Sequence, residues 1–573
     1  MKAQPTIPQP RALPCTLRAT LTATLLPALV LLLTIHSGQG GSATWKSSPF
    51  TNDWNTAANW TPATVPNGSS DVATFGASSL TGVSLSASVE VAQIVFSAGT
   101  SAFTLSVQPS VILTLSGVGV TNNSGVTQNF SPPTGGSGGT IFFLNNAKAG
   151  TDNVYTLHST VTQPGFLTFA NTASADNATI IDHGGTYDTG GVLFEHSSTA
   201  GNATFILDGG PDGLEIGGSL SFESSATGGS AKITAAGTVG SFQAFTGSNV
   251  VFHMSSNAEN ASITAGGALS TAFGEAIISF ADDASAGNAT LTANGGINGG
   301  EGGLIAFGAR STGGTAKITL SGNGQLDISS HFTSPALAIG SLAGNGDAFL
   351  GQFNLSIGGD SLSTTFSGVL QDGGGAGGTG GALTKIGSGA LTLTGDNIYT
   401  GGTQITKGIL LVNNRGGSGT GTGPVQVRAG TLGGRGTISG TVSVGDDRGQ
   451  GGFLAPSAGT TKPSRLTIQS ALTFQSDGTY TCKVNTRSVH ADQVSTNGVT
   501  INPGAQFNLT AAGNNVLPVG QVFTVIDNTS ANPISGTFSN LPIGGTIQIG
   551  RNTFQANYEG GDGNDLTLTV LSN

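Results

Sequence analysis

Apolar and polar residues alternate with a period of two over residues 141–356, and this alternation recurs as six copies of one unit. Each copy has a phenylalanine, an alanine nine residues later and an apolar residue two positions beyond the alanine. A period of two predicts β-strands, whereas helical repeats need a period near 3.6. The phenylalanines are Phe169, Phe194, Phe222, Phe252, Phe280 and Phe307, and the alanines are Ala178, Ala203, Ala231, Ala261, Ala289 and Ala316.

The unit length varies between 25 and 30 residues, but the nine-residue offset never changes. Insertions are therefore confined to the glycine-rich remainder of each unit, as expected when packing restrains one strand-turn-strand corner. We expect an all-β parallel β-helix, or β-solenoid, in which equivalent residues stack coil on coil. The phenylalanines would then form one internal ladder and the alanines another. Phe143 and Phe332 keep the spacing at the two ends without the alanine, which is typical of degenerate terminal coils.

Residues 380–414 contain four further short apolar-alternating runs separated by glycine and asparagine. These features are typical of strands joined by tight turns. The runs are Leu383 to Ile386, Ala390 to Thr394, Thr403 to Ile405 and Ile409 to Val412. Within this stretch no acid, base or nucleophile is arranged for catalysis, so it predicts architecture rather than chemistry.

This stretch resembles an autotransporter-associated β-strand repeat, also called the passenger-associated transport repeat. The resemblance extends to the flanking sequences STTFSGVLQDG, GTLGGRGTISGTVSVG and NYEGGDGNDLTLTV. It implies a right-handed parallel β-helix in a large exported bacterial protein, where such repeats help the passenger to cross the outer membrane. The matching positions are Leu383, Lys385, Gly387, Gly389, Leu391, Leu393, Gly395, Asn397, Tyr399, Gly401, Gly402, Thr403, Ile405, Gly408 and Leu410.

Autotransporters end in a translocator barrel, and the residues after the repeat are too few to form one. We therefore expect a member without a C-terminal barrel. Such a protein would need separate secretion machinery to reach the cell surface or the extracellular medium, or it would stay in the periplasm.

The first 42 residues have the features of a secretory signal peptide, with cleavage expected near residues 40 to 43. Lys2, Arg11 and Arg18 precede an apolar run from Leu21 to Ile35, and small residues follow it. The run is short for a membrane-spanning helix, so we expect no retained transmembrane segment.

The charge of the chain limits the classes of partner, and its cysteine content limits the disulfides that it can form. The formal net charge is −11, and it falls to about −14 without the three basic residues of the leader. An acidic chain whose arginines after the leader all lie at Arg310 or later is a poor ligand for nucleic acid. Cys482 is the single cysteine after the leader. We expect it to be a buried core residue rather than half of an intramolecular disulfide.

All three tryptophans of the chain, Trp45, Trp54 and Trp60, lie close together just after the leader. One interpretation is a cap that covers the open apolar end of a solenoid. The alternative is a platform on which the exposed rings stack against sugar rings. Similar tryptophan-rich segments commonly precede the repeat family, which favours the cap.

The expected organisation has five parts. A signal peptide at 1–42 precedes the N-terminal cap and first coils at 43–140, and the repeat array occupies 141–356. Solenoid coils at 357–450 include the transport-type repeat at 381–412, and a less repetitive C-terminal β region occupies 451–573.

The polar residues that could carry chemistry have simpler structural interpretations. Asp282 and Asp283 fall in the variable part of a repeat, and Asp208, Asp212 and Glu215 lie in a turn sequence. The single GGDGND motif at 560–565 lacks the consecutive copies of a calcium-binding repeat, so we expect a terminal hairpin. The histidines after the leader have no metal-ligand spacing, and Lys232 and Lys317 occupy an exposed alternating position. We therefore expect no catalytic residue, metal or cofactor.

Three functions remain open at this point. The first is an exported, non-catalytic β-solenoid that acts as a surface, stalk or adhesin-like structural protein. The second is a carbohydrate-binding surface protein that uses Trp45, Trp54 and Trp60 or a solenoid face, with a glycan or another cell-surface component as its partner. The third and most remote is a β-helix enzyme that degrades polysaccharides.

Overall fold

The computed structural model describes two compact units, residues 40–311 and 312–572, and each is treated separately. The described ranges are 40–131, 139–159, 165–185, 190–208, 217–238, 247–271, 274–332 and 336–572. Residues 1–39 of the expected signal peptide at 1–42 lie outside the described residues. None of the helices within the described residues is long and apolar enough to cross a membrane.

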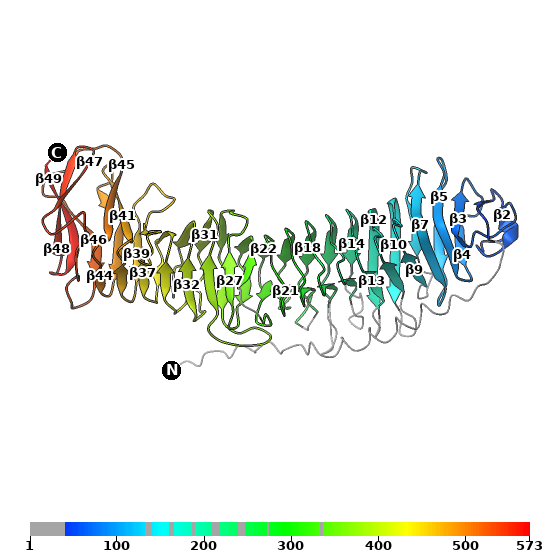
Figure 1. Cartoon of the computed structure of the whole chain (residues 1–573), viewed down its shortest axis with the longest axis horizontal. Helices are drawn as coiled ribbons and strands as arrows, with labels where there is room; N and C mark the ends of the chain where they lie inside the picture. The colour runs from blue at the N-terminus through cyan, green and yellow to red at the C-terminus, as the bar shows by residue number, and fades with distance from the viewer. Residues whose placement is uncertain are drawn as a thin grey trace. The chain divides into compact units, whose positions relative to one another are not determined.

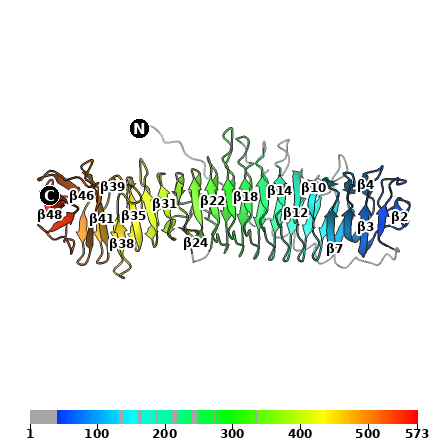
Figure 2. The same cartoon turned by 90° about the horizontal axis from the view of Figure 1, so that it is seen from above.

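Unit 1 is built on two parallel sheets whose strands come from successive coils (Figures 1 and 2). A short antiparallel pair, β1 with β2, begins the first sheet, and the 3-10 helix η1 (Ala57–Asn59) directly precedes β2. In spatial order this sheet contains β2 (Trp60–Thr61), β1 (Ala43–Trp45), β3 (Gly68–Phe75), β5 (Val89–Phe96), β7 (Ile112–Asn122), β9 (Thr140–Phe143), β11 (Phe166–Phe169), β13 (Gly191–Phe194), β15 (Ser219–Phe222), β17 (Asn249–Phe252), β19 (Ile277–Phe280) and β21 (Leu304–Phe307).

The second sheet of unit 1 takes one strand from each coil after the corner that follows the phenylalanine strand. Its strands are β4 (Gly82–Leu85), β6 (Thr104–Val107), β8 (Gln128–Ser131), β10 (Thr151–Ser159), β12 (Asn177–Gly185), β14 (Thr204–Leu207), β16 (Lys232–Ala235), β18 (Ser262–Ala265) and β20 (Thr290–Ala293).

The phenylalanine ladder expected from the sequence is present. Phe169, Phe194, Phe222 and Phe252 are register partners in consecutive strands, and all are fully buried. Neighbouring rings stack with centroid distances of 4.5–4.9 Å along the column from Phe143 to Phe307. The buried alanines lie beside one another in successive coils, because Lys232 N–H donates to Ala203 O and Ser262 N–H donates to Ala231 O. The parallel β-solenoid prediction is confirmed.

The corner after each phenylalanine has a left-handed residue at its second position. Seven non-glycine residues adopt φ between 51° and 61° there. Their carbonyl oxygens accept hydrogen bonds from the next coil, as when Thr172 N–H donates to Asn145 O. These corner residues are Asn145, Asn171, His196, Ser224, Met254, Asp282 and Ala309.

Unit 2 also pairs its strands in parallel, in three sheets. The first contains β22 (Lys317–Leu320), β25 (Ser341–Gly344), β28 (Thr364–Phe366), β31 (Ala390–Leu393), β33 (Ile409–Val412), β35 (Gly430–Gly434), β38 (Gly452–Leu454), β41 (Thr479–Asn485) and β45 (Gln506–Ala512), with β42 (His490–Ala491) antiparallel to β41. The second contains β24 (Leu337–Ile339), β27 (Asn354–Ile357), β30 (Ala382–Lys385), β32 (Gly402–Ile405), β34 (Val425–Val427), β37 (Val442–Val444), β40 (Leu472–Phe474) and β44 (Val499–Ile501). The third contains β23 (Gln325–Asp327), β26 (Asp347–Phe349) and β29 (Val369–Gln371).

A mixed sheet closes unit 2. It contains β36 (Thr437–Ile438), β39 (Arg465–Ile468), β43 (Gln493–Thr496), β46 (Val522–Asn528), β49 (Asp565–Ser572), β48 (Asn552–Gly560) and β47 (Thr546–Ile549), and its last pairings are antiparallel. β48 and β49 form the hairpin expected from the GGDGND motif, with Gly560 opposite Asp565. Cys482 is fully buried in β41, as expected.

Phe332 departs from the pattern that its spacing suggested. Its side chain is 75% exposed, while the preceding His331 is buried. Strand β23 ends at Asp327, so Phe332 lies beyond the strand that would have turned it toward the core.

Candidate functional site

A column of uncharged polar side chains runs across the second sheet of unit 2. The column takes one residue from each strand from β27 to β44, and all of its members occupy the same register position. Their neighbours along each strand, such as Leu383 in β30 and Ile405 in β32, are core residues. Strand alternation therefore turns the column away from the core. Its members are Ser356, Thr384, Gln404, Gln426, Ser443, Thr473 and Thr500.

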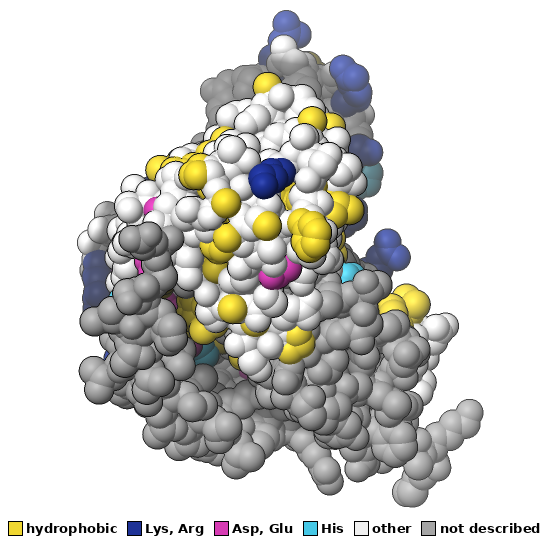
Figure 3. All heavy atoms as spheres, turned by 90° about the vertical axis from the view of Figure 1, so that its right-hand side faces the viewer, with side chains coloured by type: hydrophobic (Ala, Val, Ile, Leu, Met, Phe, Trp, Pro, Cys, Tyr) yellow, Lys and Arg dark blue, Asp and Glu magenta, His cyan; other side chains and the backbone are white. Residues whose placement is uncertain are grey.

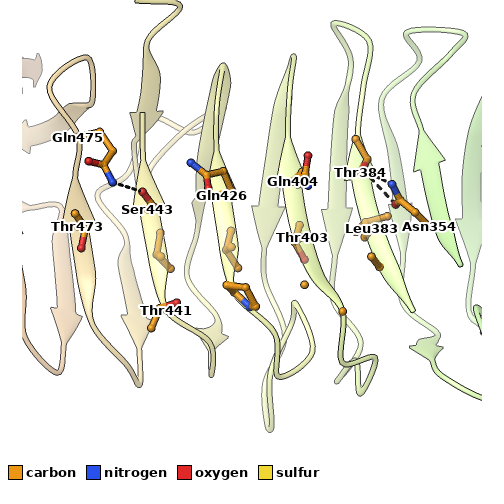
Figure 4. Close-up of a pocket in the computed structure, with 16 residues that line it drawn as sticks. Asn354, Leu383, Thr384, Thr403, Gln404, Gln426, Thr441, Ser443, Thr473 and Gln475 are labelled. Carbon is orange, nitrogen blue, oxygen red and sulfur yellow. Dashed lines mark hydrogen bonds between the residues drawn. The ribbon is translucent and has the colours of Figure 1, made fainter. Parts of the chain in front are cut away.

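Small residues beside this column leave a hollow of about 360 Å³, which we call the amide groove. Ala382 in β30, Gly402 in β32 and Pro424, which directly precedes β34, line it. Gly402 has φ of +95°, and a Cβ there would lie 2.6 Å from Pro424 O, so only glycine fits. Together with the members from Thr384 to Thr473, the labelled lining in Figure 4 includes Asn354, Thr441 and Gln475. None of the described residues that line the groove is charged.

The two ends of the amide groove are tied by side-chain hydrogen bonds, while its middle is open. Asn354 and Thr384 exchange two hydrogen bonds of 2.9 and 3.1 Å at one end. Gln475 donates to Ser443 at 3.0 Å near the other end (Figure 4). Gln426 donates its Nε2 to Gly445 O at 3.0 Å. Within the described part of the chain no hydrogen bond engages the exposed amide of Gln404 or the Oε1 of Gln426. The Gln404 amide and the Gln426 Oε1 are therefore available to a ligand.

The transport-type repeat contributes β30 to β33, and its polar residues bind neighbouring turns. Lys385 stands in register with Ile357 and Ile405, in a column of core residues, and is only 1% exposed. Its ammonium donates to the carbonyl oxygens of Ile386, Gly387 and Lys407. Desolvation by burial lowers the pKa of Lys385 to about 8, opposed by the charge of Asp360.

Asn397 and Tyr399 of the same repeat are also buried, and their side chains make hydrogen bonds within the protein. Asn397 accepts a hydrogen bond from Leu370 N–H and donates one to Gly419 O, so its side chain joins the coils on both sides. The Tyr399 hydroxyl bonds the Thr403 hydroxyl at 2.5 Å, and burial raises the pKa of Tyr399. Lys385 and Asn397 therefore tie neighbouring coils together, whereas the Tyr399 hydroxyl bonds within its own coil.

The three tryptophans form the cap of unit 1 and are not a platform. All are buried, and their rings surround Phe75 at centroid distances of 5.6–6.0 Å. Each indole N–H donates to a backbone carbonyl: Trp45 to Leu80, Trp54 to Pro66 and Trp60 to Trp54. Rings this enclosed cannot stack on sugars, so the structure does not support the tryptophan-based carbohydrate alternative. Figure 3 shows this end of the unit, where hydrophobic side chains lie in small separate patches among polar atoms.

Asn59 holds the cap loop together, a role that no pattern in the sequence indicates. Its side chain is fully buried and makes four hydrogen bonds. The Oδ1 atom accepts from the backbone N–H groups of Phe50 and Thr51, and the Nδ2 atom donates to the Thr51 hydroxyl and Asp53 O. Every hydrogen-bonding position of the amide is thus satisfied.

The structure brings together polar side chains that lie in separate coils and far apart in the sequence. His183 lies in the next coil after His158, with ring centroids 5.7 Å apart, and its Nδ1 is 2.8 Å from Asp208 Oδ2. The neighbouring Asp182 is buried, and this burial raises its pKa to about 6, opposed by hydrogen bonds from Ser219 and Gly184 N–H. Among the described residues, no group of three or more histidine, cysteine or acidic side chains is suited to hold a metal ion.

The remaining candidate residues lie in structural roles or outside the described ranges. Asp283 makes a bidentate pair with Arg310, with both distances 2.6 Å, and hydrogen bonding to Arg310 lowers the pKa of Asp283. Asp282 occupies a left-handed corner and accepts from Met254 N–H. Asp212 and Glu215 lie outside the described residues. Lys232 and Lys317 are exposed, as expected.

Comparisons with known proteins support the presence of a transport-type repeat in this chain. Residues 383–412 match the passenger-associated transport repeat. Over 123 residues the chain is 37% identical to a Brucella suis biovar 1 (strain 1330) protein named adhesin BmaC autotransporter. That match covers 22% of this chain but only 3% of the relative, so the chain spans a small part of that protein's length. A match to the crystal structure of the Haemophilus influenzae Hap adhesin covers 87% of this chain and 63% of that one. It has 12% identity and a TM-score of 0.26, too low to establish a shared architecture.

Proposed function

We propose that this chain, which carries a passenger-associated transport repeat, is an exported, non-catalytic and adhesin-like structural protein that acts at the cell surface. The observation that carries the proposal is the repeat at residues 383–412, together with its place inside a parallel β-solenoid. The similarity to a named adhesin autotransporter supports the same class of function.

The use of the polar residues supports a structural role. Lysine and asparagine usually lie on protein surfaces, but Lys385 and Asn397 are buried, and each donates a hydrogen bond to a neighbouring coil. A solenoid tied internally in this way presents its outward strand positions as a long, regular surface. Such a surface suits adhesion, because many weak contacts along one face add up to strong attachment.

The test is surface display. The full chain followed by a translocator barrel is produced in a bacterium with an outer membrane, and protease accessibility and attachment to host cells and to other bacteria are measured. We expect protease-accessible chain on intact cells and several-fold more attachment than with the barrel alone. Folded chain on the surface without any gain in attachment would contradict the adhesive role.

The non-catalytic part has a separate test. The purified chain is incubated with neutral and acidic polysaccharides, and new reducing ends and unsaturated products are measured. We expect neither. Their release at a rate proportional to the amount of chain would establish a degrading enzyme instead.

A further inference from the structure

We propose that the amide groove binds a linear, uncharged polysaccharide laid across the strands of the second sheet of unit 2. This inference rests on the proposed function and names its ligand class. The groove is the hollow already described, with Gln404 and Gln426 at its open middle.

The groove presents side chains to a ligand, but no unpaired backbone N–H or C=O groups. Strand β32 is paired in parallel with β30 on one side and with β34 on the other, and β34 is paired further with β37. Their backbone N–H and C=O groups are already used in the ladders. An extended peptide cannot add to a sheet at its interior, since strand addition needs an open edge. A ligand in this groove is therefore recognised by side chains alone.

The available side chains suit hydroxyl groups. The exposed Gln404 amide has both of its ends unengaged within the described residues, and the Gln426 Oε1 is also open. An amide both donates and accepts, so it can bind two neighbouring hydroxyls of one sugar. Thr441 and Thr473 supply further hydroxyls along the lining. Sugar hydroxyls likewise donate and accept, so this lining complements them.

The absence of charge in the lining excludes other polymers. Binding of an acidic glycan or a nucleic acid relies on lysine and arginine contacts to its anionic groups. The described lining residues include neither, and they include no carboxylate that would select a basic peptide. An uncharged polysaccharide can enter this groove without leaving any charged group unpaired.

The spacing of the column suits a repeating ligand. Adjacent strands lie about 4.8 Å apart, so the five column positions that line the groove, from Thr384 to Thr473, span roughly 19 Å. This length accommodates several sugar units in a row. No aromatic ring lines the described groove, so each unit would bind weakly and affinity would grow with chain length.

The test uses the full chain after leader removal in native gels that contain galactomannan, xyloglucan, dextran, heparin, gelatin or no polymer. We expect at least one neutral polymer to retard the chain. The double substitution Gln404→Ala with Gln426→Ala should weaken this retardation at least tenfold. Ala382→Leu, which fills the hollow without removing a hydrogen bond, should weaken it as well. The matched control is Thr264→Ala with Thr292→Ala, two outward positions on β18 and β20 of unit 1.

Melting temperatures of all variants are compared, because a loss of binding counts only in a folded chain. The inference is overturned if no neutral polymer retards the chain, or if the double groove variant binds as the parent does. It is also overturned if only heparin or gelatin is bound through the same two glutamines. Surface attachment measured on the displayed groove variant separates the two proposals. Attachment that survives without groove binding leaves the adhesive function standing and removes only this ligand.

Discussion

The phenyl rings of Phe222 and Phe252 stack with their centroids 4.5 Å apart and their planes within 3° of parallel. The two residues are register partners in β15 and β17, and neither is exposed to solvent. Phe252 stacks in the same way on Phe280, at 4.9 Å. Each ring in the middle of the ladder is therefore covered on both faces by its equivalents in adjacent coils.

Phe252→Ala should strongly destabilise unit 1. The substitution removes a ring stacked on both faces and leaves a cavity in a packed core, which costs about 3–5 kcal/mol. Urea unfolding followed by circular dichroism measures the loss. Glu259→Ala, at a partly exposed turn, is the control and should change stability by less than about 0.5 kcal/mol. Equal unfolding free energies for the two variants would contradict the ladder.

Met254→Asn should stabilise the same unit. Met254 has φ of 55° and is 53% exposed. Its backbone is therefore strained by the left-handed conformation, and its side chain packs too little to offset that strain. Asparagine adopts this conformation readily. Asn171 at the equivalent corner also donates to Asn145 at 3.2 Å. We expect a gain of about 0.5–1 kcal/mol, measured by urea unfolding. Ser255→Asn at the next, ordinary position should bring no gain, and a similar rise there would refute the strain argument.

Asn59→Ala should open the tryptophan cap. The change removes four hydrogen bonds and leaves two backbone N–H groups without their acceptor, at a cost of about 2–4 kcal/mol. Limited proteolysis near residue 50 and tryptophan fluorescence both report the opening. Phe50→Ala, whose side chain is 83% exposed, should behave as the parent. Unchanged protease resistance of the Asn59 variant would show that the amide is dispensable.

Unit 2 should become more stable between pH 8 and pH 10 through Lys385. Its pKa is lowered to about 8 in the folded chain from an ordinary value of 10.5. In this range the unfolded chain holds more protons on this residue than the folded chain, so rising pH favours folding. The contribution is lost as the pH falls through 8. Lys385→Met removes the titrating group, so the difference in unfolding free energy between parent and variant should change across this range. A constant difference from pH 7 to 10 would show that the lysine has an ordinary pKa.

Sequence patterns were most informative where packing restricts spacing. The nine-residue offset between phenylalanine and alanine is constant because both ends of the corner are buried, and the ladder followed from it. Phe332 keeps the same spacing yet lies outside any strand, since spacing alone does not state where a strand ends. For the tryptophans the sequence left a cap and a sugar platform open, and burial of all three rings decided for the cap.

The amide groove could not be read from the sequence. Ser443 follows Gln426 by 17 residues and Thr473 follows Ser443 by 30, because the turns between these strands differ in length. No fixed period connects them, and only the parallel register places their side chains in one column. His158, His183 and Asp208 likewise meet only through strand stacking.

The sequence by itself determined the repeating β-architecture and the transport-type repeat, because both depend on which residue types recur at short, constrained distances. The tertiary structure decided which polar residues are buried and tie coils together, and which face solvent and are available to a ligand. Lys385 and Gln404 lie one strand apart in the same sheet, yet one is 1% exposed and the other faces solvent. That difference follows from strand alternation and from the register between coils, which no local pattern of residues contains.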